Sequence, residues 1–205
     1  MINTYFIGGS PCSGKSTVAE IIANRYDLYY FKVDDYLDKY TELGAKKNLE
    51  ICMKQKVLSP EQIWMREPII QCKEELQFYE EIFDFLIEEL KSISYEGGIV
   101  TEGAAYLPEL MKQMNVAPNR YISITPTKDF QMFHYKKREW VPFVLEGCSD
   151  KGKAFENWME RDALFADEVR RQCERENYRS IVNDGTISIE ELVDVMIKQF
   201  GIFRE

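Results

Sequence analysis

Residues 9–16 read Gly-Ser-Pro-Cys-Ser-Gly-Lys-Ser, a complete G-x-x-x-x-G-K-S string. The string follows a short apolar run at residues 5–7 and precedes a helical pattern, which is the context of a Walker A phosphate-binding loop. Glycines allow the backbone N–H groups of such a loop to turn toward a polyphosphate, and the positive end of the next helix faces the same anion. The sequence therefore predicts a nucleotide site made by Gly9, Ser10, Pro11, Cys12, Ser13, Gly14, Lys15, Ser16 and Thr17.

Three side chains of this loop have predicted roles. Lys15 is expected to act in catalysis by reaching the β- and γ-phosphates, and the Ser16 hydroxyl to bind Mg²⁺. Cys12 is expected to have a lowered pKa because backbone N–H groups surround it. We interpret Cys12 as tolerated rather than catalytic, and we expect its oxidation to block nucleotide binding. ATP and Mg²⁺ are the predicted cofactors.

Composition limits the compartment and the partners. The 205 residues predict one domain, 1–205, with a core of its own. A net charge of −9 argues against a nucleic-acid partner, and no apolar stretch approaches the length of a membrane span. Five scattered cysteines without a C-x-x-C pair suggest free thiols. We therefore expect a cytoplasmic protein that acts on a small-molecule substrate without a membrane partner, and its oligomeric state stays open.

Short apolar runs alternate with helical patterns along the chain. Strands are predicted at residues 4–8, 29–33, 99–101, 121–124 and 180–182. Helices are predicted at 15–25 and, from the capping box Ser188-Ile189-Glu190-Glu191, up to Phe200. This alternation predicts a parallel sheet covered by helices on both faces, with ligands at the carboxyl ends of the strands.

Residues 36–92 contain no convincing strand. Ser59-Pro60-Glu61-Gln62 predicts a helix start, and a later stripe of apolar residues has helical spacing. Its members are Leu76, Tyr79, Ile82, Phe83, Leu86 and Leu90. We interpret the stripe as core and the segment as a helical acceptor-binding insertion above the phosphate loop. Trp64 within it is a candidate for lining the acceptor pocket.

Acidic residues end two predicted strands. Asp34 and Asp35 follow the second strand, where one carboxylate is expected to accept the proton of an acceptor hydroxyl and the other to bind substrate or a magnesium water. Asp34 is the preferred base, although the two could exchange roles. Glu102 ends the third strand at the place of a Walker B acid, which predicts metal binding, base duty or substrate contact. Helix capping by the two aspartates and a structural contact by Glu102 are the alternatives.

A segment at about residues 134–160 has the features of a lid. Basic residues precede a loop with Pro142, Gly147 and Gly152. Arg138 and Arg161 are the candidate catalytic arginines that fold over the γ-phosphate, and a surface position is the alternative for each. His134, the only histidine, pairs with no nucleophile in the sequence, so we expect a structural or surface role for it.

With these features assembled, the chain resembles the P-loop kinases of the nucleoside and nucleotide kinase superfamily. The resemblance implies an α/β P-loop NTPase fold of three layers, a five-stranded parallel sheet in the order 2-3-1-4-5, and a lid after the fourth strand. It implies that the loop after the last strand, residues 183–186 with Asp184 and Gly185 at its centre, runs along the adenine base. The acid after the second strand is similar to the one that contacts the acceptor in shikimate kinase, gluconate kinase and chloramphenicol phosphotransferase.

One departure from the resemblance bears on the acceptor. Nucleotide monophosphate kinases carry an arginine shortly after the acid–glycine pair of the third strand, and no cation follows Glu102-Gly103 here. The sequence therefore favours an ATP-dependent kinase that phosphorylates the hydroxyl of an unidentified small molecule. A nucleotide monophosphate kinase, with Arg66 and Lys54 in place of the missing arginine, is one alternative. A nucleotide-binding regulatory switch or ATPase is the other, although the chain has no N-K-x-D guanine motif.

Overall fold

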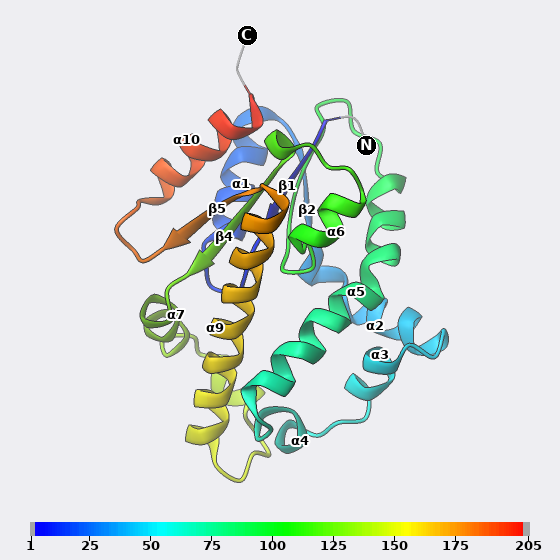
Figure 1. The fold of residues 1–205 in the computed structure, drawn as a ribbon, viewed down its shortest axis with the longest axis vertical. Coiled ribbons are helices and arrows are strands. Elements are labelled where there is room, and N and C mark those ends of the chain that lie inside the picture. Colours follow the sequence, from blue (N-terminus) through cyan, green and yellow to red (C-terminus); the bar gives the residue numbers. More distant parts are fainter. Residues whose placement is uncertain (1–2, 203–205) are drawn as a thin grey trace.

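A five-stranded, all-parallel sheet forms the centre of the computed structural model, which describes residues 3–202 (Figure 1). The strand order is β2-β3-β1-β4-β5, which confirms the predicted order and the α/β class. The strands are β1 (Thr4–Gly8), β2 (Tyr29–Lys32), β3 (Ile99–Glu102), β4 (Tyr121–Pro126) and β5 (Arg179–Asn183).

Helices cover both faces of the sheet and complete three layers. Helices α1 (Lys15–Tyr26) and α10 (Ile189–Phe200) lie on one face, and α5 (Pro68–Ser92), α6 (Pro108–Gln113) and α9 (Lys151–Glu176) lie on the other. Successive side chains of β1 point to opposite faces, so Tyr5 and Ile7 enter one core while Phe6 enters the other. Between residues 3 and 202, no helix has the length and apolarity needed to cross a membrane.

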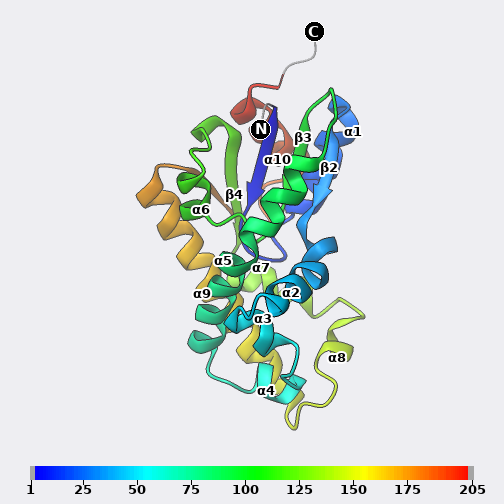
Figure 2. The same cartoon turned by 90° about the vertical axis from the view of Figure 1, so that its right-hand side faces the viewer.

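The predicted insertion is helical and lies beyond the carboxyl ends of the strands (Figure 2). It contains a 3₁₀ turn η1 (Val33–Tyr36), α2 (Leu37–Lys46), α3 (Glu50–Gln55), α4 (Pro60–Trp64) and the start of α5. The predicted helix start is confirmed, because the Ser59 side chain accepts a hydrogen bond from the backbone N–H of Gln62. The same reciprocal capping box, between Ser188 and Glu191, opens α10.

The segment predicted to be a lid is mostly helical and packs against the insertion. The elements η2 (Pro118–Arg120) and β4 precede this segment. It begins in the last turn of α7 (Lys128–Tyr135), continues through α8 (Val141–Val144) and includes the first turns of α9. Trp158 of α9 stacks on Trp64 of α4 with ring centroids 4.6 Å apart, and Glu61 accepts a 2.7 Å hydrogen bond from the N–H of Ser149. The two segments therefore form one wall beyond the end of the sheet, with a shared core of Tyr135, Val141, Leu145, Cys148, Ala154, Trp158 and Met159.

Candidate functional site

The phosphate loop connects β1 to α1 and has the backbone of an anion cradle. Gly9 has φ of +118°, and a Cβ there would lie 1.8 Å from the carbonyl oxygen of Ile124, so only glycine fits. Gly14 has φ of +96° and precedes the first residue of α1. The hydroxyl of Ser10 is buried and has no hydrogen-bond partner among the described residues. An orphaned hydroxyl inside a loop of this shape fits the binding of a polyphosphate.

A cavity of about 420 Å³ opens on the loop. Besides loop residues, its wall contains Arg138, the predicted lid arginine, and Asn183, the first residue of the loop expected to run along the base. Three further residues on the wall had no predicted nucleotide contact: Phe130, His134 and Ile189. Phe130 and His134 lie side by side on α7 with ring centroids 4.2 Å apart. The sequence of α7 carries no signal for this position.

Lys15 is buried at the floor of this cavity. Its Nζ donates to the carbonyl oxygen of Ser10 at 2.7 Å and to Oγ of Ser13 at 3.5 Å. Burial lowers the pKa of Lys15, while the carboxylates of Glu102 and Asp34 oppose that shift. Lys15 therefore lies between the loop and both predicted acids, as phosphate neutralisation requires.

Glu102 ends β3 beneath the phosphate loop and is 1% exposed. Its carboxylate accepts a hydrogen bond from Tyr30 at 3.2 Å and interacts with the Ser16 hydroxyl. Burial raises the pKa of Glu102, and Lys15 opposes the shift. Ser16 and Glu102 fit the predicted magnesium site, because Mg²⁺ uses few protein oxygens and takes the rest from phosphates and water. Residues 3–202 contain no group of three or more His, Cys, Asp or Glu side chains that could hold a metal alone.

The structure separates the two aspartates that follow β2. Both lie in η1 and are exposed. Asp35 forms a 3.7 Å ion pair with Lys32. Asp34 instead interacts electrostatically with Lys15, Glu102 and Tyr79. Asp34 is thus the acid of the pair that belongs to the site, and its role as a base stays a prediction.

The expected low pKa of Cys12 is corrected by the structure. Burial raises the pKa of the Cys12 thiol, and the nearby cations of Arg138 and Lys15 only partly oppose this shift. Arg138 lies over the ring of Tyr135, 4.7 Å from its centroid, and interacts with the same thiol. The loop N–H groups were expected to favour the thiolate, but the desolvation of Cys12 has the larger effect.

Arg161 does not lie where the sequence analysis expected it. It is absent from the wall of the phosphate-loop cavity and lines a second cavity in the insertion. Its guanidinium forms ion pairs with Glu75 and, at 2.6 Å, with Asp162, and it lies 5.3 Å from the ring centroid of Trp64. The structure therefore places Arg161 on the wall of the second cavity and not on the wall of the phosphate-loop cavity.

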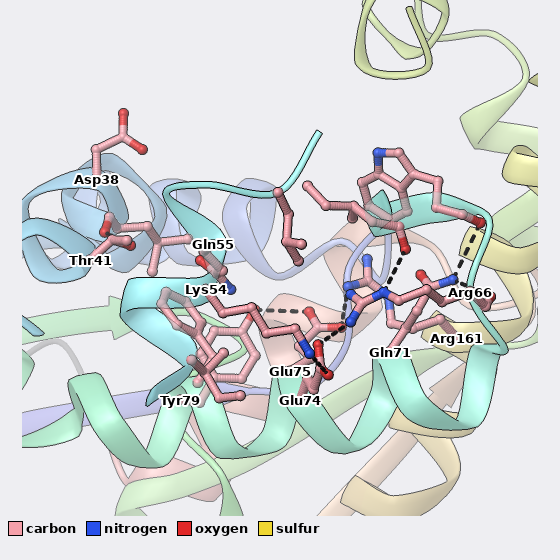
Figure 3. A pocket seen from close by; sticks show the side chains of 16 residues that line it. Asp38, Thr41, Lys54, Gln55, Arg66, Gln71, Glu74, Glu75, Tyr79 and Arg161 are labelled. Atoms are coloured by element: carbon pink, nitrogen blue, oxygen red, sulfur yellow. Dashed lines mark hydrogen bonds and ion pairs between the residues drawn. The ribbon is translucent and has the colours of Figure 1, made fainter. Parts of the chain in front are cut away.

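The second cavity has a volume of about 360 Å³ and lies among α2–α5 and α9 (Figure 3). Trp64 lines it, in the region predicted for the acceptor. Lys54 and Arg66 both form ion pairs with Glu74 on its wall. The remaining lining residues are Leu37, Asp38, Thr41, Ile51, Gln55, Leu58, Ile63, Gln71, Glu75, Phe78, Tyr79 and Arg161.

Asp184 and Gly185 lie just outside the nucleotide cavity. The Asp184 carboxylate accepts hydrogen bonds from the N–H and the hydroxyl of Thr186, and Gly185 packs on Phe130. Their predicted contact with the base stays a prediction. The residue that reaches the loop is Asn183, whose amide donates to the carbonyl oxygen of Ser13 at 3.0 Å. Asn183 therefore connects the end of β5 to the phosphate loop.

Comparisons with known proteins add similar structures but no family. No protein-family model and no curated protein matches the sequence. Among solved structures, the chain is similar to deoxyadenosine kinase from M. mycoides with bound dATP (14% identity, TM-score 0.48, covering 97% of this chain and 99% of that one). It is also similar to an uncharacterized protein from Eubacterium ventriosum (18% identity, TM-score 0.48, covering 98% and 99%). Both scores are below 0.5, so the likeness says nothing of what this chain binds.

Proposed function

We propose that this chain is an ATP-dependent kinase that transfers the γ-phosphoryl group to a hydroxyl of a small molecule. The observation that carries the proposal is the position of Asp34. It interacts electrostatically with Lys15, at the phosphate loop, and with Tyr79, which lines the second cavity. Asp34 lines neither cavity, but a carboxylate that interacts with groups on the walls of both has the place of a residue that orients or deprotonates a phosphoryl acceptor.

Each residue then has a defined task. Lys15 and Arg138 neutralise the phosphates, and Ser16 and Glu102 hold Mg²⁺. Asp34 would accept the proton of the acceptor hydroxyl. The hydroxyl oxygen would then bond to the γ-phosphorus as the bond between that phosphorus and the leaving ADP oxygen breaks. Bound ATP–Mg²⁺ supplies the phosphoryl group and neutralises part of its charge.

The ion pairs of the second cavity favour a hydroxyl acceptor over a phosphate acceptor. Lys54 and Arg66, the substitutes for the missing phosphate-clamping arginine, both neutralise Glu74. Arg161 is neutralised by Glu75 and Asp162. A monophosphate would have to break one of these pairs, so the nucleotide monophosphate kinase alternative lacks a free cation on this wall.

The test is Mg²⁺-dependent ADP release with a panel of sugars, cyclitols, nucleosides, hydroxylated antibiotics and nucleoside monophosphates. Asp34→Asn is compared with Asp35→Asn, a matched control because Asp35 pairs with Lys32 instead. We expect a hydroxyl compound to stimulate the wild type, and Asp34→Asn to lower kcat by about 10²-fold or more with ATP binding intact. Equal activity of the two variants, or stimulation by monophosphates alone, would overturn the proposal.

A further inference from the structure

Among the described residues, the wall of the second cavity has no free cation for an acidic ligand. Its three basic residues, Lys54, Arg66 and Arg161, all form ion pairs with acids of α5 or α9. Two of these acids, Glu74 and Glu75, line the cavity themselves. Phosphate or carboxylate groups would meet carboxylates without gaining an unpaired partner.

Gln71 leaves one hydrogen-bond acceptor unused in this cavity. Its side chain is 4% exposed, and Nε2 donates to the carbonyl oxygens of Arg66 at 2.8 Å and Trp64 at 3.4 Å (Figure 3). These two bonds define the orientation of the amide. With the amide reversed, the side-chain oxygen of Gln71 would face the two carbonyl oxygens, and no hydrogen bond could form. Oε1 is buried and has no partner among the described residues. A buried acceptor without a donor is unfavourable until a ligand supplies one.

The charged groups nearest to Gln71 already have partners. Glu75 lies one turn after Gln71 on α5, accepts a 3.1 Å hydrogen bond from Tyr79 and forms an ion pair with Arg161. Nε of Arg161 in turn lies 2.6 Å from Oδ1 of Asp162. Oε1 of Gln71 is therefore the one buried side-chain acceptor on this wall with neither a hydrogen bond nor an ion pair among the described residues.

We infer that the acceptor is a polyhydroxylated compound without phosphate or carboxylate, and that Gln71 determines specificity by accepting a hydrogen bond from a hydroxyl other than the one phosphorylated. The inference rests on the proposed kinase function, since that function makes this cavity the acceptor site. A hydroxyl can donate to Oε1 of Gln71 and, being neutral, leaves the ion pairs of the wall intact. A volume of about 360 Å³ suits a monosaccharide, a cyclitol or a nucleoside.

The experiment measures binding and turnover separately. Calorimetry with a non-hydrolysable ATP analogue compares myo-inositol with cyclohexanol, and adenosine with its 2′,3′-dideoxy analogue, so each pair differs in the number of hydroxyls. Gln71→Met removes the free acceptor. Asn157→Leu is the matched control, because Asn157 Nδ2 donates to the same two carbonyls, of Trp64 and Arg66, but the side chain does not line this cavity. ADP release is then measured with ATP and Mg²⁺.

We expect a polyol to bind wild type and Asn157→Leu about tenfold or more tightly than its monohydroxyl partner, and Gln71→Met to lose most of that preference. The inference would be overturned if the polyol and its monohydroxyl partner bound equally, or if no compound of either pair bound. It would also be overturned if Gln71→Met kept the preference for the polyol, or if Asn157→Leu lost that preference to the same extent. Polyol binding without ADP formation would instead overturn the kinase proposal and leave the inference on the cavity standing. ADP formation without a preference for polyols would overturn the inference on the cavity and leave the kinase proposal standing.

Discussion

Oδ1 of Asp162 lies 2.6 Å from Nε of its sequence neighbour Arg161; Asp162 is fully buried and the Arg161 side chain is 14% exposed. Oδ2 of Asp162 accepts a 2.9 Å hydrogen bond from Gln131 of α7, while Arg161 also pairs with Glu75 of α5. Asp162 interacts electrostatically with Lys15 as well. The pair therefore connects the wall of the second cavity to the phosphate loop through groups that are largely shielded from water.

Removal of Asp162 is expected to destabilise the fold strongly. Asp162→Ala leaves Arg161 buried with one acidic partner, and breaking a buried pair in this way costs about 3–5 kcal/mol of the free energy of unfolding. Urea unfolding at about pH 8.5, above the Asp162 pKa of about 7, measures this cost with the carboxylate ionised. The control is Glu160→Gln, because Glu160 lies on α9 like Asp162 but pairs with Lys128 of α7 at the surface. Loss of this exposed ion pair should cost less than about 1 kcal/mol. Similar costs for both variants would show that the buried pair contributes little.

Stability should also depend on pH through Asp162. Burial, reinforced by Glu75 and opposed by Arg161, raises the pKa of Asp162 from 3.8 to about 7. Other titratable groups that interact with it are Lys15, Cys12 and Tyr135. Because the folded protein holds this proton more tightly than the unfolded chain, its contribution to the free energy of unfolding falls as pH rises from about 4 to about 7.

The pH dependence is measured as a difference between two proteins. Urea unfolding of wild type and Asp162→Asn at several pH values between about 4.5 and 7.5 isolates the carboxyl group, since the amide does not titrate. We expect the stability of the wild type relative to the variant to decrease across this range. A difference that is constant or increases with pH would show that the Asp162 carboxyl is ionised throughout.

Asn183 should matter more for nucleotide binding than Asp184. Asn183→Leu removes the donor to the buried loop carbonyl of Ser13, which costs about 1–3 kcal/mol and should weaken binding of a non-hydrolysable ATP analogue by about tenfold. Asp184→Asn changes an exposed turn residue and should leave affinity within about twofold. Calorimetric titration of both variants with the ATP analogue measures the two affinities. A larger loss of affinity in Asp184→Asn than in Asn183→Leu would contradict the prediction.

Cys12 should react slowly with alkylating reagents at neutral pH. Its raised pKa keeps the thiol protonated at pH 7, and the thiolate is the nucleophile. Iodoacetamide labelling, followed by mass spectrometry with Cys12→Ser as the reference, should be slow at pH 7 and should rise with pH without levelling off near the pKa of a free thiol, about 8.5. ATP should protect the residue because Cys12 lines the phosphate-loop cavity. The other four cysteines are buried. Fast labelling of Cys12 at pH 7 would contradict the raised pKa.

Much of the fold could be predicted from local patterns. The strands, the two capping boxes and the phosphate loop each depend on residues within a few positions of one another, so the sequence carries their signals directly. Asp34 and Glu102 were found in the same way, because they end strands whose carboxyl ends share one edge of the sheet.

Several features of the site could not be predicted. Phe130 and His134 reach the nucleotide cavity only because α7 packs beside the phosphate loop. The sequence preferred Asp34 as the base but left its role exchangeable with Asp35, because the distinction depends on which carboxylate interacts with Lys15 and which pairs with Lys32.

By itself, the sequence determined the α/β class, the strand order by resemblance, and a phosphate loop with acids at the ends of neighbouring strands. Tertiary structure alone decided that Arg161 lines the second cavity, that Gln71 has a buried, unused acceptor there, and that burial raises the pKa of Cys12. The physical reason is the range of the interactions. Motifs and caps form between near neighbours in sequence, whereas burial and ion pairing depend on residues that only the folded chain brings together.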